Sequence, residues 1–86
     1  MTDVKNKSVM ITGASRGIGA AAARKFAELG AKVMLCARSG GEIEEIAAEI
    51  TKNGGTAIAQ KTDVADFEEV QGAVDHASSA FGGLDI

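Results

Sequence analysis

The sequence predicts an α/β protein whose parallel sheet is doubly wound, with helices on both faces. Three short apolar runs alternate with three longer segments in which apolar residues recur at helical spacing. We expect strands at 8–12, 32–37 and 56–63, and helices at 17–29, 42–52 and 67–81. Such alternation is typical of parallel strands joined by right-handed helical crossovers. A glycine-rich turn between the first strand and the first helix also favours this fold.

The first expected strand contains three consecutive apolar residues, 9–11, which suits a strand covered on both faces. The apolar residues that recur on one face of the following helix are Ile18, Ala22, Phe26 and Leu29. We expect this face to be buried against the sheet.

The second expected strand is equally apolar and contains Cys36, the only cysteine. A lone cysteine in such a run is best interpreted as a small buried hydrophobe. The stripe that we expect helix 42–52 to bury consists of Ile43, Ile46, Ala47 and Ile50.

The third expected strand is the most polar, as an edge strand should be. In helix 67–81 the apolar face consists of Phe67, Val70, Val74, Ala77 and Phe81. Asp66 with Glu69 three residues later resembles a capping box at the start of this helix. Residues 84–86 look like the start of a fourth strand, so the expected order is 3-2-1-4. The backbone edge at 9–11 would then be largely unpaired, and we expect a homo-oligomer.

The composition limits the possible functions. The 86 residues suffice for one small domain, and a formal net charge of −3 argues against a general nucleic-acid surface. No apolar run approaches a membrane span, and the first residues lack the apolar region of a signal peptide, so a cytoplasmic location is the default expectation. The single histidine, His76, has no partner at ligand spacing; we therefore expect a surface residue and no metal site.

The glycine-rich turn reads Thr-Gly-Ala-Ser-Arg-Gly-Ile-Gly over residues 12–19. Gly13 can adopt the positive φ that ends the strand, Gly17 lets backbone approach a diphosphate, and Gly19 allows close packing of the helix. The first N–H groups of the helix lack intrahelical acceptors, so this turn can bind an anion. The alternative is a tight turn that binds no ligand.

The end of the second strand predicts the type of dinucleotide. Dinucleotide folds that select NAD carry a carboxylate at this position, whereas here Ala37 is followed by Arg38 and Ser39. A guanidinium can pair with a 2′-phosphate, and Arg16 in the glycine turn could reach the same group. Two arginines without an acid favour NADP. The alternative is that either arginine is only a solvated loop residue.

The turn at 12–19, together with Asp63 and Val64, resembles the cofactor signature of the short-chain dehydrogenase/reductase family, and the similarity extends over 7–86. The resemblance implies a Rossmann-like βαβαβα fold plus the start of a fourth strand, with 1–86 as the N-terminal part of one dinucleotide-binding domain. It also implies that Asp63 and Val64 contact the adenine, although a turn before helix 67–81 would explain Asp63 equally well. The residues that we expect to contact the cofactor are Gly13, Ser15, Arg16, Gly17, Ile18, Gly19, Arg38, Ser39, Asp63 and Val64.

The resemblance also implies an oxidoreductase that transfers a hydride between NADP(H) and a small carbonyl or alcohol substrate. The two arginines resemble the pattern of reductases that act on 3-oxoacyl thioesters. The family's catalytic Tyr-x-x-x-Lys pair has no match, because the sequence contains no tyrosine. We therefore name no catalytic residue. The alternatives are a non-catalytic nucleotide-binding module and a fragment that retains only the fold.

Overall fold

The computed structural model describes residues 4–15 and 17–86. Strands and helices alternate, as the sequence predicts. The elements in chain order are β1 (Ser8–Thr12), α1 (Gly17–Glu28), β2 (Lys32–Ala37), α2 (Gly40–Lys52), β3 (Thr56–Lys61) and α3 (Phe67–Phe81).

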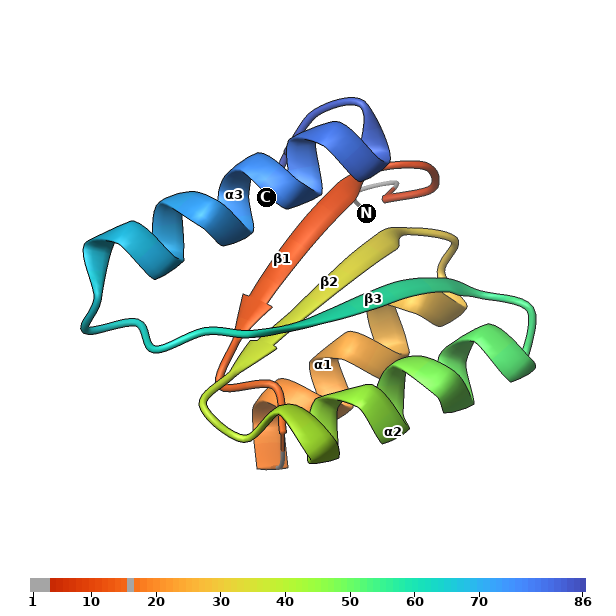
Figure 1. Cartoon of the computed structure of the whole chain (residues 1–86). Coiled ribbons are helices and arrows are strands. Elements are labelled where there is room, and N and C mark those ends of the chain that lie inside the picture. Colours follow the sequence, from red (N-terminus) through yellow and green to blue (C-terminus); the bar gives the residue numbers. More distant parts are fainter. Residues whose placement is uncertain (1–3, 16) are drawn as a thin grey trace.

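The three strands form one parallel sheet in the order β1-β2-β3 (Figure 1). In its register Ser8 pairs with Lys32, and Ala37 at the end of β2 pairs with Lys61 at the end of β3. Helices α1 and α2 cover one face of the sheet and α3 covers the other, so the sheet is doubly wound (Figure 1).

Side chains alternate between two apolar clusters because neighbouring residues of a strand point to opposite faces. On the α1 and α2 side, β2 contributes Val33 and Leu35, and α2 contributes all four residues of its expected stripe. On the α3 side, Met34 and Cys36 pack against Ala73 and Ala77. The interpretation of Cys36 as a small buried hydrophobe is confirmed, since its exposed fraction is 0%.

The expected buried stripe of α1 is only partly confirmed, because Phe26 packs against the core but the two ends of the stripe do not. Ile18 is 90% exposed and Leu29 is 47% exposed, whereas the helix buries Ala20, Ala23 and Ala27. Three alanines at helical spacing let the helix axis lie close to the sheet, which larger side chains on that face would prevent.

The expected face of α3 is partly wrong for a similar reason. Phe67 is 78% exposed, while Ala73 and Ala77 are fully buried and Phe81 packs against their cluster. Phe67 occupies the first turn, which projects beyond the end of the sheet in Figure 1.

Three element boundaries differ from the expectation. Helix α1 ends at Glu28, one residue before the expected end. Helix α2 begins at Gly40, two residues before the expected start. Strand β3 ends at Lys61. The Thr62 N–H still donates to the Ala37 carbonyl at 2.8 Å, and the chain then turns toward α3 through the bonds that Asp63 accepts from the Ala65 and Asp66 N–H groups.

Residues 84–86 lie along β1, where the fourth strand was expected, without forming a regular strand. The Met10 N–H donates to the Ile86 carbonyl at 2.8 Å, and the Ile86 and Asp85 N–H groups donate to the Ser8 carbonyl, each at 3.0 Å. The Asp85 carboxylate also accepts the Ser8 N–H at 2.8 Å. The expectation of a largely unpaired edge at 9–11 is therefore wrong around Met10.

Candidate functional site

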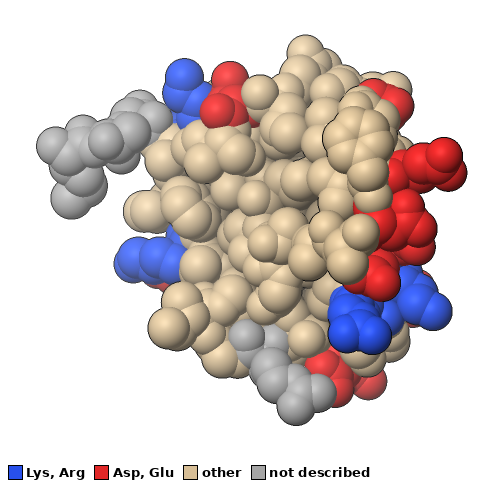
Figure 2. Space-filling model, turned by 90° about the vertical axis from the view of Figure 1, so that its left-hand side faces the viewer, with Lys and Arg blue, Asp and Glu red and all other residues tan. Residues whose placement is uncertain are grey.

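The carboxyl ends of the three strands bring the predicted segments to one edge of the sheet. The glycine turn follows β1, Arg38 and Ser39 follow β2, and Asp63 and Val64 follow β3 by one residue. In parallel α/β sheets this is the edge where ligands bind. Figure 2 shows the side of the molecule toward which these ends point. Its centre consists of uncharged residues, and the charged side chains lie toward its margins.

Two of the glycines adopt the backbone conformation that the turn requires. Gly13 and Gly17 both have φ of +61°, a left-handed value that side chains with a Cβ rarely adopt. The Ala14 N–H between them donates to the Cys36 carbonyl at 3.1 Å, which ties the turn to β2. A Cβ added at Gly17 would meet no described atom within 4 Å, so space is open where α1 begins.

Gly19 has a different role. A Cβ at this position would lie 2.2 Å from the Gly13 carbonyl oxygen and 3.1 Å from the Ala14 Cα. The first turn of α1 therefore rests directly on the backbone of the glycine turn. The sequence predicted that Gly19 lets the helix lie close on the sheet, whereas the atoms that lie against Gly19 belong to the glycine turn.

Ser15 and Ile18 flank the position where α1 starts. Ser15 is half-buried, whereas Ile18 projects into solvent. Arg16 lies outside the described residues, so its expected role beside Arg38 stays a prediction. The first N–H groups of a helix have no intrahelical acceptors, so the start of α1 has the donors that an anion site requires.

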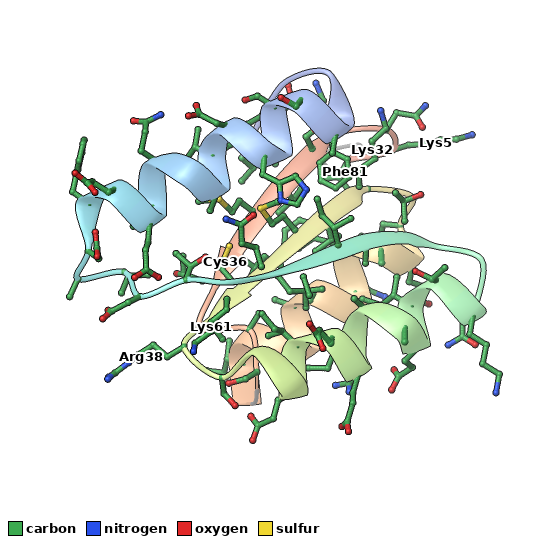
Figure 3. The ribbon with its side chains drawn as sticks, viewed as in Figure 1. Lys5, Lys32, Cys36, Arg38, Lys61 and Phe81 are labelled. Carbon is green, nitrogen blue, oxygen red and sulfur yellow. The ribbon has the colours of Figure 1, made fainter. Side chains whose placement is uncertain are left out.

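Arg38 and Ser39 are both exposed at the end of β2. Ser39 is the N-cap residue of α2, and within the described chain its side chain makes no capping hydrogen bond. The Ser39 hydroxyl therefore does not accept a hydrogen bond from the first N–H groups of α2. Figure 3 shows the Arg38 side chain extending away from the body of the molecule at this corner.

Asp63 takes part in a hydrogen-bonded turn before α3. One of its carboxylate oxygens accepts the Ala65 N–H at 2.9 Å, and its own N–H donates to the Glu69 carboxylate at 3.0 Å. Val64, between them, is 59% exposed. These bonds support the interpretation of Asp63 as a turn residue, and contact with the adenine by Asp63 and Val64 stays a prediction.

Lys61 is a residue of this edge that the sequence reasoning missed. It is exposed at the end of β3, beside Ala37, and its side chain lies over Gly40 at the start of α2. Alternate residues of a strand share a face, so Lys61 lies on the same face as Ala57 and Ala59, which pack on the α1 and α2 side. This pattern would have placed Lys61 at the same end of the sheet as Arg38.

Other titratable side chains fit structural roles. Burial raises the pKa of the Cys36 thiol above its ordinary value of 9.0, and a hydrogen bond with Thr62 opposes this effect in part. His76 is exposed and its Nδ1 pairs with the Gln60 side chain, as expected for a surface histidine. Across residues 4–15 and 17–86, no three His, Cys, Asp or Glu side chains are grouped so as to hold a metal ion.

Two hollows on the surface lie away from the glycine turn. One, of about 510 Å³, lies between the carboxyl ends of α1 and α2, beside the Arg24–Glu49 ion pair. The other, of about 630 Å³, lies between α2 and β3 and reaches His76. Neither is lined by the predicted site residues. In the part of the chain that the structure describes, no helix has both the length and the apolar character needed to cross a membrane.

Comparison with known proteins identifies the class to which this fold and site belong. The family model described as short chain dehydrogenase matches residues 7–86, so the chain belongs to the short-chain dehydrogenase/reductase family. Its Rossmann-like fold is the nucleotide-binding fold of that family of oxidoreductases.

Similar proteins are considerably longer. The chain is 44% identical over 86 residues to an uncharacterized oxidoreductase of Mycobacterium tuberculosis, with 96% of this chain and 25% of the relative covered. A hydroxysteroid dehydrogenase from Escherichia coli is similar in structure, with a TM-score of 0.93, 34% identity, and coverage of 96% of this chain and 35% of that one. A short-chain dehydrogenase/reductase from Burkholderia phymatum in complex with NAD also has a TM-score of 0.93 and 34% identity, with 98% and 30% covered. The chain thus spans a quarter to about a third of the length of these proteins.

Proposed function

We propose that this chain is the NADP(H)-binding portion of an oxidoreductase that transfers a hydride between a nicotinamide cofactor and a carbonyl or alcohol substrate. The observation that carries the proposal is the cradle formed by the glycine turn. Gly13 and Gly17 have positive φ, and the space beside Gly17 is open at the start of a helix of twelve residues. Family membership supports the same cofactor class.

The cradle suits the diphosphate of a dinucleotide. N–H groups at the start of α1 offer hydrogen bonds to anionic oxygens, and the helix dipole adds partial positive charge. We infer that Gly13, Ser15, Gly17, Ile18 and Gly19 form the wall on which the diphosphate and its neighbouring sugar rest. Gly19 acts indirectly, because its missing Cβ keeps the helix start against the turn.

We propose NADP rather than NAD because of the chemistry at the end of β2. Arg38 and Ser39 are exposed there and follow Ala37, so the end of this strand offers a guanidinium and a hydroxyl. The similar Burkholderia protein was solved with NAD, so the choice of cofactor has to rest on this chain's own residues. A guanidinium favours a 2′-phosphate through charge-assisted hydrogen bonds, which a free 2′-hydroxyl cannot match.

A bound nicotinamide cofactor supplies the hydride in this class of reaction. The residues of this chain hold the adenosine end and the diphosphate, and thereby orient the cofactor. We propose that Asp63 and Val64 contact the adenine from the end of β3. Since the sequence contains no tyrosine, we assign cofactor binding and no proton transfer to these 86 residues.

Equilibrium titration with NADP⁺ and NAD⁺ tests the proposal. Charge-assisted hydrogen bonds contribute about 1.5–3 kcal/mol each, which corresponds to roughly ten- to hundredfold in affinity. We therefore expect the unmodified chain to prefer NADP⁺ by at least about tenfold and Arg38→Asp to abolish this preference. Lys52→Asp, the same charge reversal in the last turn of α2, is the control and should leave the preference unchanged.

Two results would contradict the proposal at different levels. Equal affinity of the unmodified chain for the two cofactors would refute the choice of NADP while leaving a nicotinamide site in place. Failure of both to bind would refute the cofactor-binding role itself.

A further inference from the structure

Lys61 and Arg38 lie at one corner of the molecule, although they belong to different strands. The register places Lys61 directly beside Ala37, the residue that precedes Arg38. The Thr62 N–H, one residue further on, donates to the Ala37 carbonyl at 2.8 Å and holds the two strand ends together. Figure 3 shows both basic side chains at this corner.

The side chain of Lys61 runs over the start of α2. A Cβ built at Gly40 would lie 3.5 Å from the Lys61 Cβ and 3.9 Å from its Cγ and Cδ, which is ordinary van der Waals contact. The aliphatic stem of Lys61 therefore lies beside Gly40, the first residue of the helix, while the residue as a whole stays exposed.

Two basic side chains and the start of a helix lie together at this corner. Arg38 and Lys61 carry like charges on neighbouring strand ends, and α2 begins beside them with the positive end of its dipole. Two carboxylates lie nearby: Glu42 in the first turn of α2, which is half-buried, and Asp63, which accepts the Ala65 N–H. A group that carries two negative charges would be stabilised by both cations and by the helix dipole.

We propose that Lys61 is a further specificity-determining residue, which together with Arg38 recognises the 2′-phosphate of the cofactor. The inference rests on the proposed function, since it assumes that the adenosine end of a dinucleotide lies at this edge. Lys61 supplies a mobile ammonium from the β3 side, whereas Arg38 supplies a planar guanidinium from the end of β2. The other interpretation of Lys61 is a charged residue that protects an edge strand from pairing with another chain.

Titration of the 86-residue chain and its variants with NADP⁺ and NAD⁺ separates these interpretations, because the two ligands differ only in the 2′-phosphate. Lys61→Met keeps the stem over Gly40 and removes the charge. We expect it to weaken NADP⁺ binding about tenfold and to leave NAD⁺ binding unchanged. Lys61→Arg restores a cation and should restore most of the preference for NADP⁺. Lys52→Met, at the other end of α2, should change neither affinity.

Each other outcome overturns the inference in a distinguishable way. If the unmodified chain prefers NADP⁺ and Lys61→Met keeps that preference, the role of Lys61 fails and the proposed function stands. If Lys61→Met lowers the affinity for NADP⁺ and for NAD⁺ equally, the Lys61 charge acts independently of the 2′-phosphate and the inference fails. The inference also fails if Lys52→Met lowers the NADP⁺ affinity as much as Lys61→Met does. If the unmodified chain binds neither ligand, the proposed function fails with it.

Circular dichroism melts of every variant report whether the fold persists, and Lys61→Gln provides a second neutral variant. Unfolding of both neutral variants at the titration temperature would show that Lys61 is structural, which also overturns the inference.

Discussion

Gly19 shows how a single missing methyl group can determine the geometry of the site. Its nearest neighbour is backbone, the Gly13 carbonyl oxygen, which would lie 2.2 Å from an added Cβ. A flexible side chain could move away from the added group, but the backbone of this turn is also tied to β2 through Ala14. Gly19 thus requires glycine because of this close contact, whereas Gly17 requires it because of its positive φ.

We therefore predict that Gly19→Ala destabilises the fold by about 3 kcal/mol, the upper part of the usual range for inserting a group into a packed site. Gly41→Ala is the matched control, since a Cβ there meets no described atom within 4 Å. It should stay within about 1 kcal/mol of the unmodified chain, on the stabilising side, because alanine favours helix. Urea unfolding followed by circular dichroism measures both. Equal stability of the two variants would contradict the packing argument.

At the scale of the secondary-structure elements, α3 shows how a short acidic segment starts a helix. The Asp66 side chain accepts the N–H groups of Glu68 and Glu69 at 3.0 and 3.3 Å. Glu69 does not close the expected capping box on Asp66; its carboxylate accepts the Asp63 N–H instead. Hydrogen bonds of Asp63 and of Asp66 with residues in the first turn of α3 thus hold both ends of the short turn that contains Val64.

Removal of this cap gives a second stability prediction. Asp66→Ala should cost about 1 kcal/mol, as is usual when an N-cap acceptor is lost, whereas Asp66→Asn should retain most of the stability because the amide oxygen can still accept. Glu68→Ala, two residues further along the chain, serves as the control for the loss of a charge. Thermal melts distinguish the three variants, and an Asp66→Ala melt that coincides with the unmodified one would exclude a capping role.

The sequence predicts the elements well and the rotation of helices about their axes poorly. The bounds of β2 and α3 match the expectation, because apolar runs and the Asp66 signal mark them clearly. Helix α1 has two apolar faces in its sequence, and the larger residues Ile18 and Leu29 suggested the wrong one. The helix instead buries the face with Ala20, Ala23 and Ala27, and the contacts that orient a helix on a sheet are absent from any local sequence pattern.

For the candidate site, too, some features could be predicted from the sequence and others could not. Parallel strand order was enough to predict that the segments after β1, β2 and β3 meet at one edge, because that follows from topology. The proximity of Lys61 to Gly40 depends on strand register and on the position of α2, so the sequence did not reveal it. The sequence also left open whether Asp63 is a turn residue. Its hydrogen bonds with Ala65 and Glu69 are seen only in the structure.

At the scale of the whole molecule, the outer edge of β1 and the exposed apolar side chains are the features on which a prediction of self-association rests. Residues 84–86 pair with Ser8 and Met10, which leaves less of this edge open than the sequence suggested. Several large apolar side chains nevertheless stay exposed, among them Ile18, Phe67 and Ile86. Contact between two copies that covers such side chains would remove apolar surface from water, which is the physical basis of the prediction that follows.

We predict that the chain forms a dimer or a larger species through the β1 side, and that Ile86→Lys weakens this association. Ile86 is 57% exposed, so the charge can be added without disturbing the core, whereas Met10 packs against the α3 cluster and a charge there would unfold it. Ala48→Lys adds the same charge to the exposed face of α2, at the β3 end of the sheet, and should leave association unchanged. Sedimentation velocity over a range of concentrations measures the effect. A monodisperse monomer with one cooperative unfolding transition would show that the three strands and residues 84–86 suffice to close the fold, because no partner would then be needed to cover the β1 side.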